Sequence, residues 1–203
     1  MSSLYLSFSV FAFIASITPG PTNVLALSSG SRQGFTATLP FVIGASFGAA
    51  LILFLTATGL ARLLFDYPEI RLTLAIIGTL WLTWMAFKLY HAPVDAPDGV
   101  TMAARPVLWQ HGMLMQFVNP KTWLMAMTVS SLFAPVSGAA LLHNLALALI
   151  FFLVTTPCIA AWAWIGSGSN RVLRSEKQRA GLNRLLAILL ALSVWVALYS
   201  GTP

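Results

Sequence analysis

Long stretches without a charged residue are the feature that most constrains how this chain folds. Only 8% of its 203 residues are charged, against about 25% in ordinary soluble domains. The charge-free stretches cover residues 1–31, 33–61, 72–87, 106–120, 122–170 and 185–203. A helix that crosses a bilayer needs about 20 mostly apolar residues. The pattern therefore predicts a membrane protein built from spanning helices.

Two of these stretches do not correspond to single helices. Residues 122–170 are too many for one span, and "APVSG" at 134–138 is a turn signal. The stretch that ends before Lys121 continues beyond it as apolar sequence. We therefore expect an all-α integral membrane protein with six transmembrane helices, at about residues 4–28, 36–61, 70–89, 110–133, 139–166 and 184–200. Because no basic residue precedes the first span, we expect it to be retained and not cleaved as a signal peptide.

The basic residues predict the orientation in the membrane. With six spans, eight of the eleven Lys and Arg residues fall in the loops after spans one, three and five. Two fall on the side of the termini, and Lys121 lies within a span. The positive-inside rule places the eight in the cytoplasm, so both termini are predicted to be periplasmic. The net charge of +6 is then explained by loops that face lipid headgroups, and we expect no nucleic-acid partner.

A polar loop near the middle of the chain divides the predicted spans into three and three. Residues 91–109 include "HAPVDAPDGVTMAARP" and form the longest polar segment. A three-span unit that is repeated returns upside down in the membrane, which is the plan of many secondary transporters. We expect one membrane domain over residues 1–203, with inverted repeats at 1–90 and 110–203 joined by a cytoplasmic linker at 91–109.

The first span of each half carries a proline motif. "GPTNVLAL" at 20–27 aligns with "NPKTWLMA" at 119–126, and each motif runs on into apolar helix. Proline interrupts helical hydrogen bonding, and unpaired backbone groups are costly in hydrocarbon. A helix that restarts after such a break offers free N–H groups and a positive dipole end to a carboxylate. Helices 1 and 4 are therefore predicted to be broken at similar depth around a binding site, with simple packing kinks as the alternative.

The predicted substrate-binding residues lie in these two motifs. They are Pro19, Gly20, Pro21, Thr22, Asn23, Asn119, Pro120 and Lys121. Lys121 either supplies a cation to the site or snorkels to the cytoplasmic surface. Asn119 either contacts the substrate or only caps a helix that begins at Pro120. In "GASFG", Gly44 and Gly48 are predicted to form a small-residue helix contact.

Several function classes lack the residues that they need. The single cysteine, Cys158, cannot form a redox pair and is interpreted as a packing residue. The loop residues His91, Asp95 and Asp98 are more typical of a solvated linker than of a metal site. The chain has no Walker A motif, so we expect no direct use of ATP, no cofactor and no enzymatic activity. The acidic residues all lie in predicted loops or at span ends, which argues against a cationic or metal substrate: Asp66, Glu69, Asp95, Asp98 and Glu176.

Taken together, "TPGPTN" at 18–23, "GASFG" at 44–48 and "FVNPKTWLM" at 117–125 are similar to a known family. The chain resembles the lysine-exporter superfamily, and within it the homoserine/threonine-exporter branch, the LysE/RhtB family. The resemblance implies amino-acid efflux across the bacterial inner membrane, coupled to the proton-motive force with a proton as coupling ion. Basic-amino-acid exporters of the superfamily carry intramembrane aspartates that this sequence lacks, so a neutral substrate of the threonine or homoserine type is expected. A membrane metal-ion or thiol-redox protein of similar span number remains the alternative.

Overall fold

The protein is built from helices throughout the part of the chain that the structure describes. A computed structural model describes residues 2–60, 66–92, 108–133, 140–172 and 175–201, and every regular element in these ranges is a helix. The all-α prediction is therefore confirmed. The elements are α1 (Ser2–Ile17), α2 (Pro21–Gln33), α3 (Phe35–Leu55), the π-helical turn η1 (Thr56–Leu60), α5 (Pro68–Tyr90), α6 (Trp109–Phe117), α7 (Pro120–Leu132), α8 (Ala140–Val172) and α9 (Glu176–Gly201).

Three of these helical segments are long and apolar enough to cross a membrane. By length and composition they are Phe35–Leu60, Ala140–Ser169 and Glu176–Val196. The segments Leu4–Ile17 and Pro21–Gln33 meet at a bend of 56° and make a fourth span if the pair is counted as one. Among the described residues, length and composition thus identify three or four spans where the sequence predicted six.

The last helix begins earlier than the sequence predicted. We expected the final span to start near residue 184, but α9 starts at Glu176. Ser175 and Gln178 explain the difference, because they form a reciprocal cap. The backbone N–H of Gln178 donates to Ser175 Oγ at 3.2 Å, and the backbone N–H of Ser175 donates to Gln178 Oε1 at 3.1 Å. This capping box satisfies N–H groups in the first turn of α9. The helix therefore begins within the charged segment that precedes residue 184.

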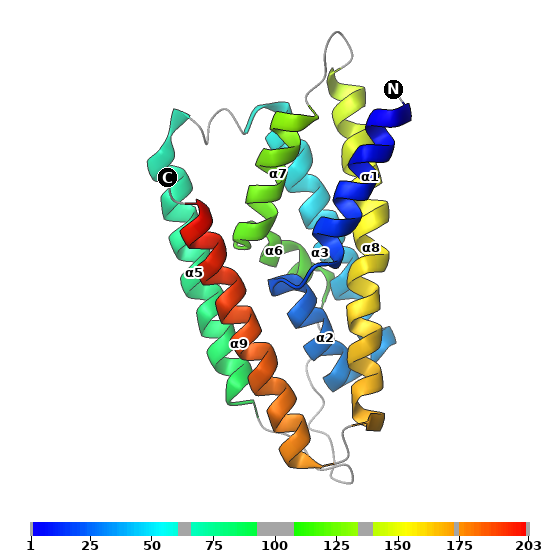
Figure 1. The fold of residues 1–203 in the computed structure, drawn as a ribbon, viewed down its shortest axis with the longest axis vertical. Coiled ribbons are helices and arrows are strands. Elements are labelled where there is room, and N and C mark those ends of the chain that lie inside the picture. The colour runs from blue at the N-terminus through cyan, green and yellow to red at the C-terminus, as the bar shows by residue number, and fades with distance from the viewer. Residues whose placement is uncertain (1, 61–65, 93–107, 134–139, 173–174, 202–203) are drawn as a thin grey trace.

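The helices of the two halves of the chain are packed against each other. The pair α1 and α2 lies against α8, α6 lies against α3, and α5 pairs with α9 at one side of the molecule (Figure 1). Gly44 and Gly48 face the backbone of α6, near Trp109 and Met113 respectively. A side chain at Gly44 would overlap the Trp109 carbonyl, so this close approach of α3 and α6 requires glycine there.

Apolar clusters lie on both sides of a buried threonine in α8. One cluster joins α1, α3, α7 and α8 and includes Phe8 and Phe151. Two other clusters involve α2, α3, α5, α6, α8 and α9, and one of them includes Ile159. Along α8, Phe151, Thr155 and Ile159 succeed one another at intervals of four residues and so share one face. The buried Thr155, whose hydroxyl lies 2.8 Å from that of Ser16, is therefore a polar position between two apolar clusters.

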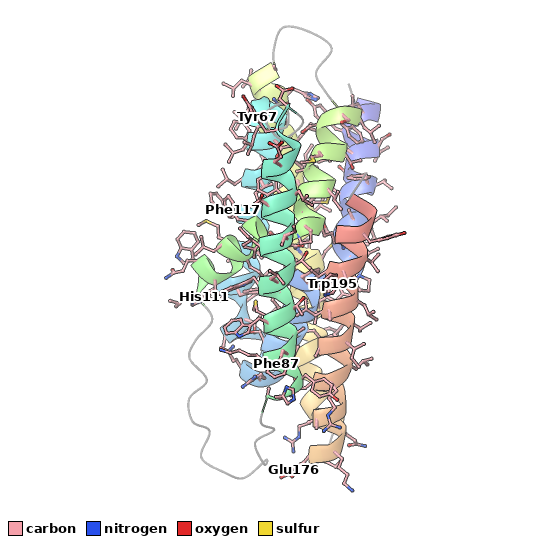
Figure 2. All side chains as sticks on the ribbon, turned by 90° about the vertical axis from the view of Figure 1, so that its left-hand side faces the viewer. Tyr67, Phe87, His111, Phe117, Glu176 and Trp195 are labelled. Carbon is pink, nitrogen blue, oxygen red and sulfur yellow. The ribbon has the colours of Figure 1, made fainter. Side chains whose placement is uncertain are left out.

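Both ends of the described chain lie toward the same end of the molecule. The last turns of α2 and α5 and the first turn of α9 lie at the opposite end (Figure 1). These turns carry Arg32, Lys88 and Lys177. Figure 2 labels Glu176, which begins α9, far from Tyr67 along the long axis of the molecule. The basic turns thus gather at the end away from the termini, the grouping from which the topology prediction was made.

Candidate binding site at two helix breaks

The first break separates α1 from α2 by three residues. Helix α1 ends at Ile17 and α2 begins at Pro21. Pro19 and Pro21 lack the N–H groups that would continue the helical hydrogen bonds, so carbonyl groups of the last turn of α1 are left open. The sequence motif therefore interrupts the helix where it was expected to do so.

Side chains take the place of the missing backbone donors at this break. The Asn23 side chain donates from Nδ2 to the backbone carbonyls of Ser16 and Thr18, at 2.8 Å each. The indole Nε1 of Trp162 donates to the carbonyl of Ile17 at 3.0 Å. Buried backbone carbonyls without a partner would be costly in an apolar setting. The break is thus stabilised by one side chain from α2 and one from α8.

Lys121 connects the second break to the first. Its Nζ donates to the Thr18 carbonyl at 2.9 Å and to Thr18 Oγ1 at 3.0 Å, and it lies 3.5 Å from the Pro19 carbonyl. The side chain passes directly over Gly20, where an added Cβ would be 2.9 Å from Lys121 Cδ. The half-buried ammonium group therefore lies at the C-terminal end of α1, where the helix dipole places negative partial charge.

The second break separates α6 from α7 and is closed by its own residues. Helix α6 ends at Phe117 and α7 begins at Pro120. Asn119 caps α7, because its Oδ1 accepts from the backbone N–H of Lys121 at 3.1 Å. The indole of Trp123 donates to the Phe117 carbonyl at 2.8 Å. This break is therefore held within one short stretch of sequence.

A buried polar network joins the two breaks. Gln116 Nε2 and Asn119 Nδ2 both donate to Thr22 Oγ1, at 3.0 and 3.1 Å. The hydroxyl of Thr122 donates to Gln116 Oε1 at 2.7 Å. All four side chains are buried. The first turns of α2 and α7 are thus tied together through neutral side chains, so the two breaks lie side by side as the sequence predicted.

A cavity lies at the junction of the two breaks. It is open on one side, and its volume of about 390 Å³ includes part of the open space outside its mouth. Lys121 is the one charged side chain among the described residues that line it, and no Asp or Glu is among them. The lining comes from α1, α2, α3, α6, α7, α8 and the breaks between them: Ala15, Ser16, Gly20, Pro21, Thr22, Asn23, Ala49, Gln116, Asn119, Lys121, Thr122, Met125, Phe151, Thr155 and Ile159.

The two helix ends at the first break offer complementary chemistry. Helix α1 presents carbonyl oxygens, which attract a cation. Helix α2 presents N–H groups, and among the described residues no side chain caps its N-terminus at Gly20. The N-terminus of α7, by contrast, is capped by Asn119. The first break can therefore bind an ammonium group at one helix end and a carboxylate at the other.

Six of the eight predicted site residues line the cavity. Pro19 is exposed and Pro120 is buried, and neither belongs to the lining, although each contributes to a break. Gln116, Thr155 and the two indoles of Trp123 and Trp162 were missed. The only available signal for Gln116 was an uncharged polar residue in an apolar segment, three residues before Asn119.

The described residues hold no group of three or more His, Cys, Asp or Glu side chains that is able to bind a metal ion. His91 is exposed at the end of α5, whereas Asp95 and Asp98 of the predicted linker cluster lie outside the described residues. Cys158 is buried in α8. None of these positions provides support for the metal or thiol-redox alternative.

Comparison with known proteins identifies the family. The family model "LysE type translocator" matches residues 13–201. A "Cysteine/O-acetylserine efflux protein" of Escherichia coli strain K12 is 29% identical over 188 residues, which cover 93% of this chain and 94% of that protein. A protein of the same name from Shigella flexneri is 30% identical over 191 residues, 94% and 95% of the two chains. No solved structure matches the chain. The chain belongs to the LysE type translocator family.

Proposed function

We propose that this protein is a secondary transporter that exports small neutral amino acids across the bacterial inner membrane. Family membership supports efflux, and the relatives are named for cysteine and O-acetylserine. The observation that carries the proposal is the cavity between the two breaks, whose lining among the described residues has one cation and no acidic residue. A cationic side chain of a substrate would find no anionic partner there, whereas a neutral side chain needs none.

The proposed architecture has six spans in two inverted three-helix repeats, at residues 1–90 and 110–203. The interrupted pair α6–α7 is the counterpart of α1–α2, and α3 and α8 are the unbroken helices that follow. Each broken helix packs on the unbroken helix of the other half, α1–α2 on α8 and α6 on α3. Such an exchange of partners is what two interlocked inverted repeats would give.

In the proposed binding mode, the substrate carboxylate lies at the uncapped N-terminus of α2 and accepts from its free N–H groups. Lys121 adds a positive charge beside that carboxylate. The bonds from its Nζ to Thr18 favour a role in the cavity over snorkelling. Asn23 and Asn119 hold the two breaks in shape, because their amide groups bind Ser16, Thr18 and Thr22.

We further propose that both termini are periplasmic and that efflux is driven by the proton-motive force. The basic turns that carry Arg32, Lys88 and Lys177 support a cytoplasmic position for the end of the molecule opposite the termini. Proton coupling is implied by the family resemblance.

An efflux panel tests the substrate class. Cells that express the chain are loaded with cysteine, O-acetylserine, threonine, homoserine, lysine or arginine, and release is compared with cells that carry an empty vector. We expect faster release of at least one neutral amino acid and unchanged release of lysine and arginine. Purified protein in proteoliposomes then shows whether an imposed proton gradient drives the same movement. Export of lysine or arginine alone would refute the proposed substrate class.

A further inference from the structure

The oxygen atoms at the end of α1 form a cradle for an ammonium group. Lys121 Nζ donates to the Thr18 carbonyl and to Thr18 Oγ1, and the Pro19 carbonyl lies 3.5 Å away. These carbonyls take no part in the helical hydrogen bonds and lie at the negative end of the helix dipole. The Thr18 carbonyl also accepts from Asn23 Nδ2, which holds it in place beside the ammonium group. The cradle is thus built for an alkylammonium ion, and it holds one that is tethered to the opposite break.

The same gap adjoins the predicted carboxylate site. Only Thr18, Pro19 and Gly20 separate α1 from α2. An α-amino acid carries its ammonium and carboxylate groups on one carbon atom. A zwitterion whose carboxylate binds the N–H groups of α2 therefore brings its ammonium group close to the carbonyls of α1. With no acidic side chain among the described lining residues, these carbonyls are strong acceptors for that group.

We propose that Lys121 is a tethered occupant of the subsite for the substrate's own ammonium group, and that substrate binding displaces its Nζ from the Thr18 and Pro19 carbonyls. This inference rests on the proposed function, since it takes the substrate to be an amino acid. Two ammonium groups cannot share one set of oxygens, because like charges at such short range repel each other strongly. Either Lys121 or the substrate occupies the cradle.

The position of Lys121 allows this exchange. The long, flexible side chain of Lys121 passes over Gly20. Because glycine has no side chain, nothing at this position restrains the lysine. When Nζ leaves Thr18, the bridge from α7 to the end of α1 opens, and the freed cation is able to pair with the substrate carboxylate. Substrate binding is thereby linked to the release of a contact between the two halves of the protein, as a transporter that changes shape with its load requires.

The test separates the two charges of the substrate. Purified protein in lipid nanodiscs is titrated with ethylammonium, an amine without a carboxylate, and with propionate, a carboxylate without an amine. Binding is followed through the shift in the thermal unfolding temperature. In Lys121→Met the tethered competitor is gone, so the half-saturating concentration of ethylammonium should fall about tenfold, the scale of one charge-assisted hydrogen bond. Propionate should bind no more tightly than in the wild type.

Lys88→Met is the matched control. It removes one positive charge from an exposed lysine that lies over the Trp84 ring and does not line the cavity. Its affinity for ethylammonium should equal that of the wild type. A similar gain in Lys88→Met would mean that the effect comes from net charge and would overturn the proposal.

Unchanged or weaker ethylammonium binding in Lys121→Met also overturns the proposal. A loss of propionate binding with no change for ethylammonium overturns it too, because Lys121 would then be a ligand of the carboxylate only. Lys121→Gln, which keeps a neutral donor for the carbonyls, should show a gain of the same sign and serves if the methionine variant folds poorly. The proposed function is tested separately, because the ethylammonium titration involves no amino acid. It is contradicted if the wild-type protein exports no neutral amino acid.

Discussion

Both helix breaks leave backbone carbonyls without helical partners, but the residues that bind these carbonyls come from different parts of the chain. At the first break, the carbonyls of Ile17 and Thr18 are bound by Trp162 and Lys121, which are 145 and 103 residues away in the chain. At the second, the Phe117 carbonyl is bound by Trp123, six residues away, and Asn119 caps the helix that follows. The backbone groups of the second break are thus bound by nearby residues. At the first break the nearby Asn23 is joined by two partners from distant parts of the chain.

This difference assigns the two breaks different roles. At the start of α7, Pro120 has no N–H group, and the N–H groups of Lys121 and Thr122 are both bound by Asn119. The second break is therefore suited to holding side chains in place. The first has a helix start that no side chain of the described residues caps, and a carbonyl bound by the long, flexible side chain of Lys121. We infer that the first break is where a ligand binds and that the second presents residues to it.

The largest expected effect is the loss of the cation at the first break. Lys121→Met should lower efflux about tenfold to a hundredfold at equal membrane abundance, because a charge-assisted hydrogen bond contributes about 1.5–3 kcal/mol and about 1.4 kcal/mol corresponds to tenfold. Initial rates of release from loaded cells, normalised to protein in the membrane, measure it. If Lys121→Met exports at the wild-type rate, Lys121 only snorkels to the membrane surface.

The second largest effect is expected from the buried polar network that links the two breaks. Gln116→Leu removes a buried amide that bonds to Thr22 and Thr122. It should lower the free energy of unfolding by about 1–3 kcal/mol, the cost of buried polar partners left unpaired, and should lower efflux as well. Thermal unfolding of purified protein in detergent measures the first effect.

Ser193→Ala is a control for this change. The Ser193 hydroxyl donates to the Leu190 carbonyl within α9, so its loss should have little effect on stability. Equal losses of stability in Gln116→Leu and Ser193→Ala would argue that the network does not join the breaks energetically.

The sequence located both breaks but only part of what stabilises them. The prolines at 19, 21 and 120 act on their own backbone, so their effect is local and was predicted. Asn119 as a cap is equally local. The bonds of Trp162 and Gln116 depend on how α8 and α6 pack, and nothing in their own segments indicates which carbonyl or hydroxyl they contact. Lys121, Asn23 and Asn119 were predicted from their motifs, whereas the amide of Gln116 and the two indoles that complete the site were not.

The two tryptophans permit a matched comparison of the breaks. Trp162→Phe and Trp123→Phe each remove one indole N–H from a break carbonyl, those of Ile17 and Phe117. Each should cost about 0.5–1.5 kcal/mol of stability. Transport should fall several-fold in Trp162→Phe and much less in Trp123→Phe, if the first break is the one that binds substrate. Equal transport losses in the two variants, measured by efflux and thermal unfolding, would remove the assigned difference in roles.

The smallest expected effect concerns the space through which Lys121 passes. Gly20 has φ −169° and ψ 176°, an extended backbone that alanine adopts without strain. In Gly20→Ala the new Cβ would lie 2.9 Å from Lys121 Cδ and 3.1 Å from its Nζ, so the side chain has to move by a few tenths of an ångström. We expect efflux to fall by about two- to fivefold through a weakened bond to Thr18, with the unfolding temperature almost unchanged. In Lys121→Met the same alanine should have a smaller effect, because no ammonium group remains for it to displace. A double-mutant cycle on the efflux rates measures this coupling. If the fold-changes in efflux rate of the two single variants multiply to give that of the double variant, Gly20 acts on the backbone of the break and not on the position of Lys121.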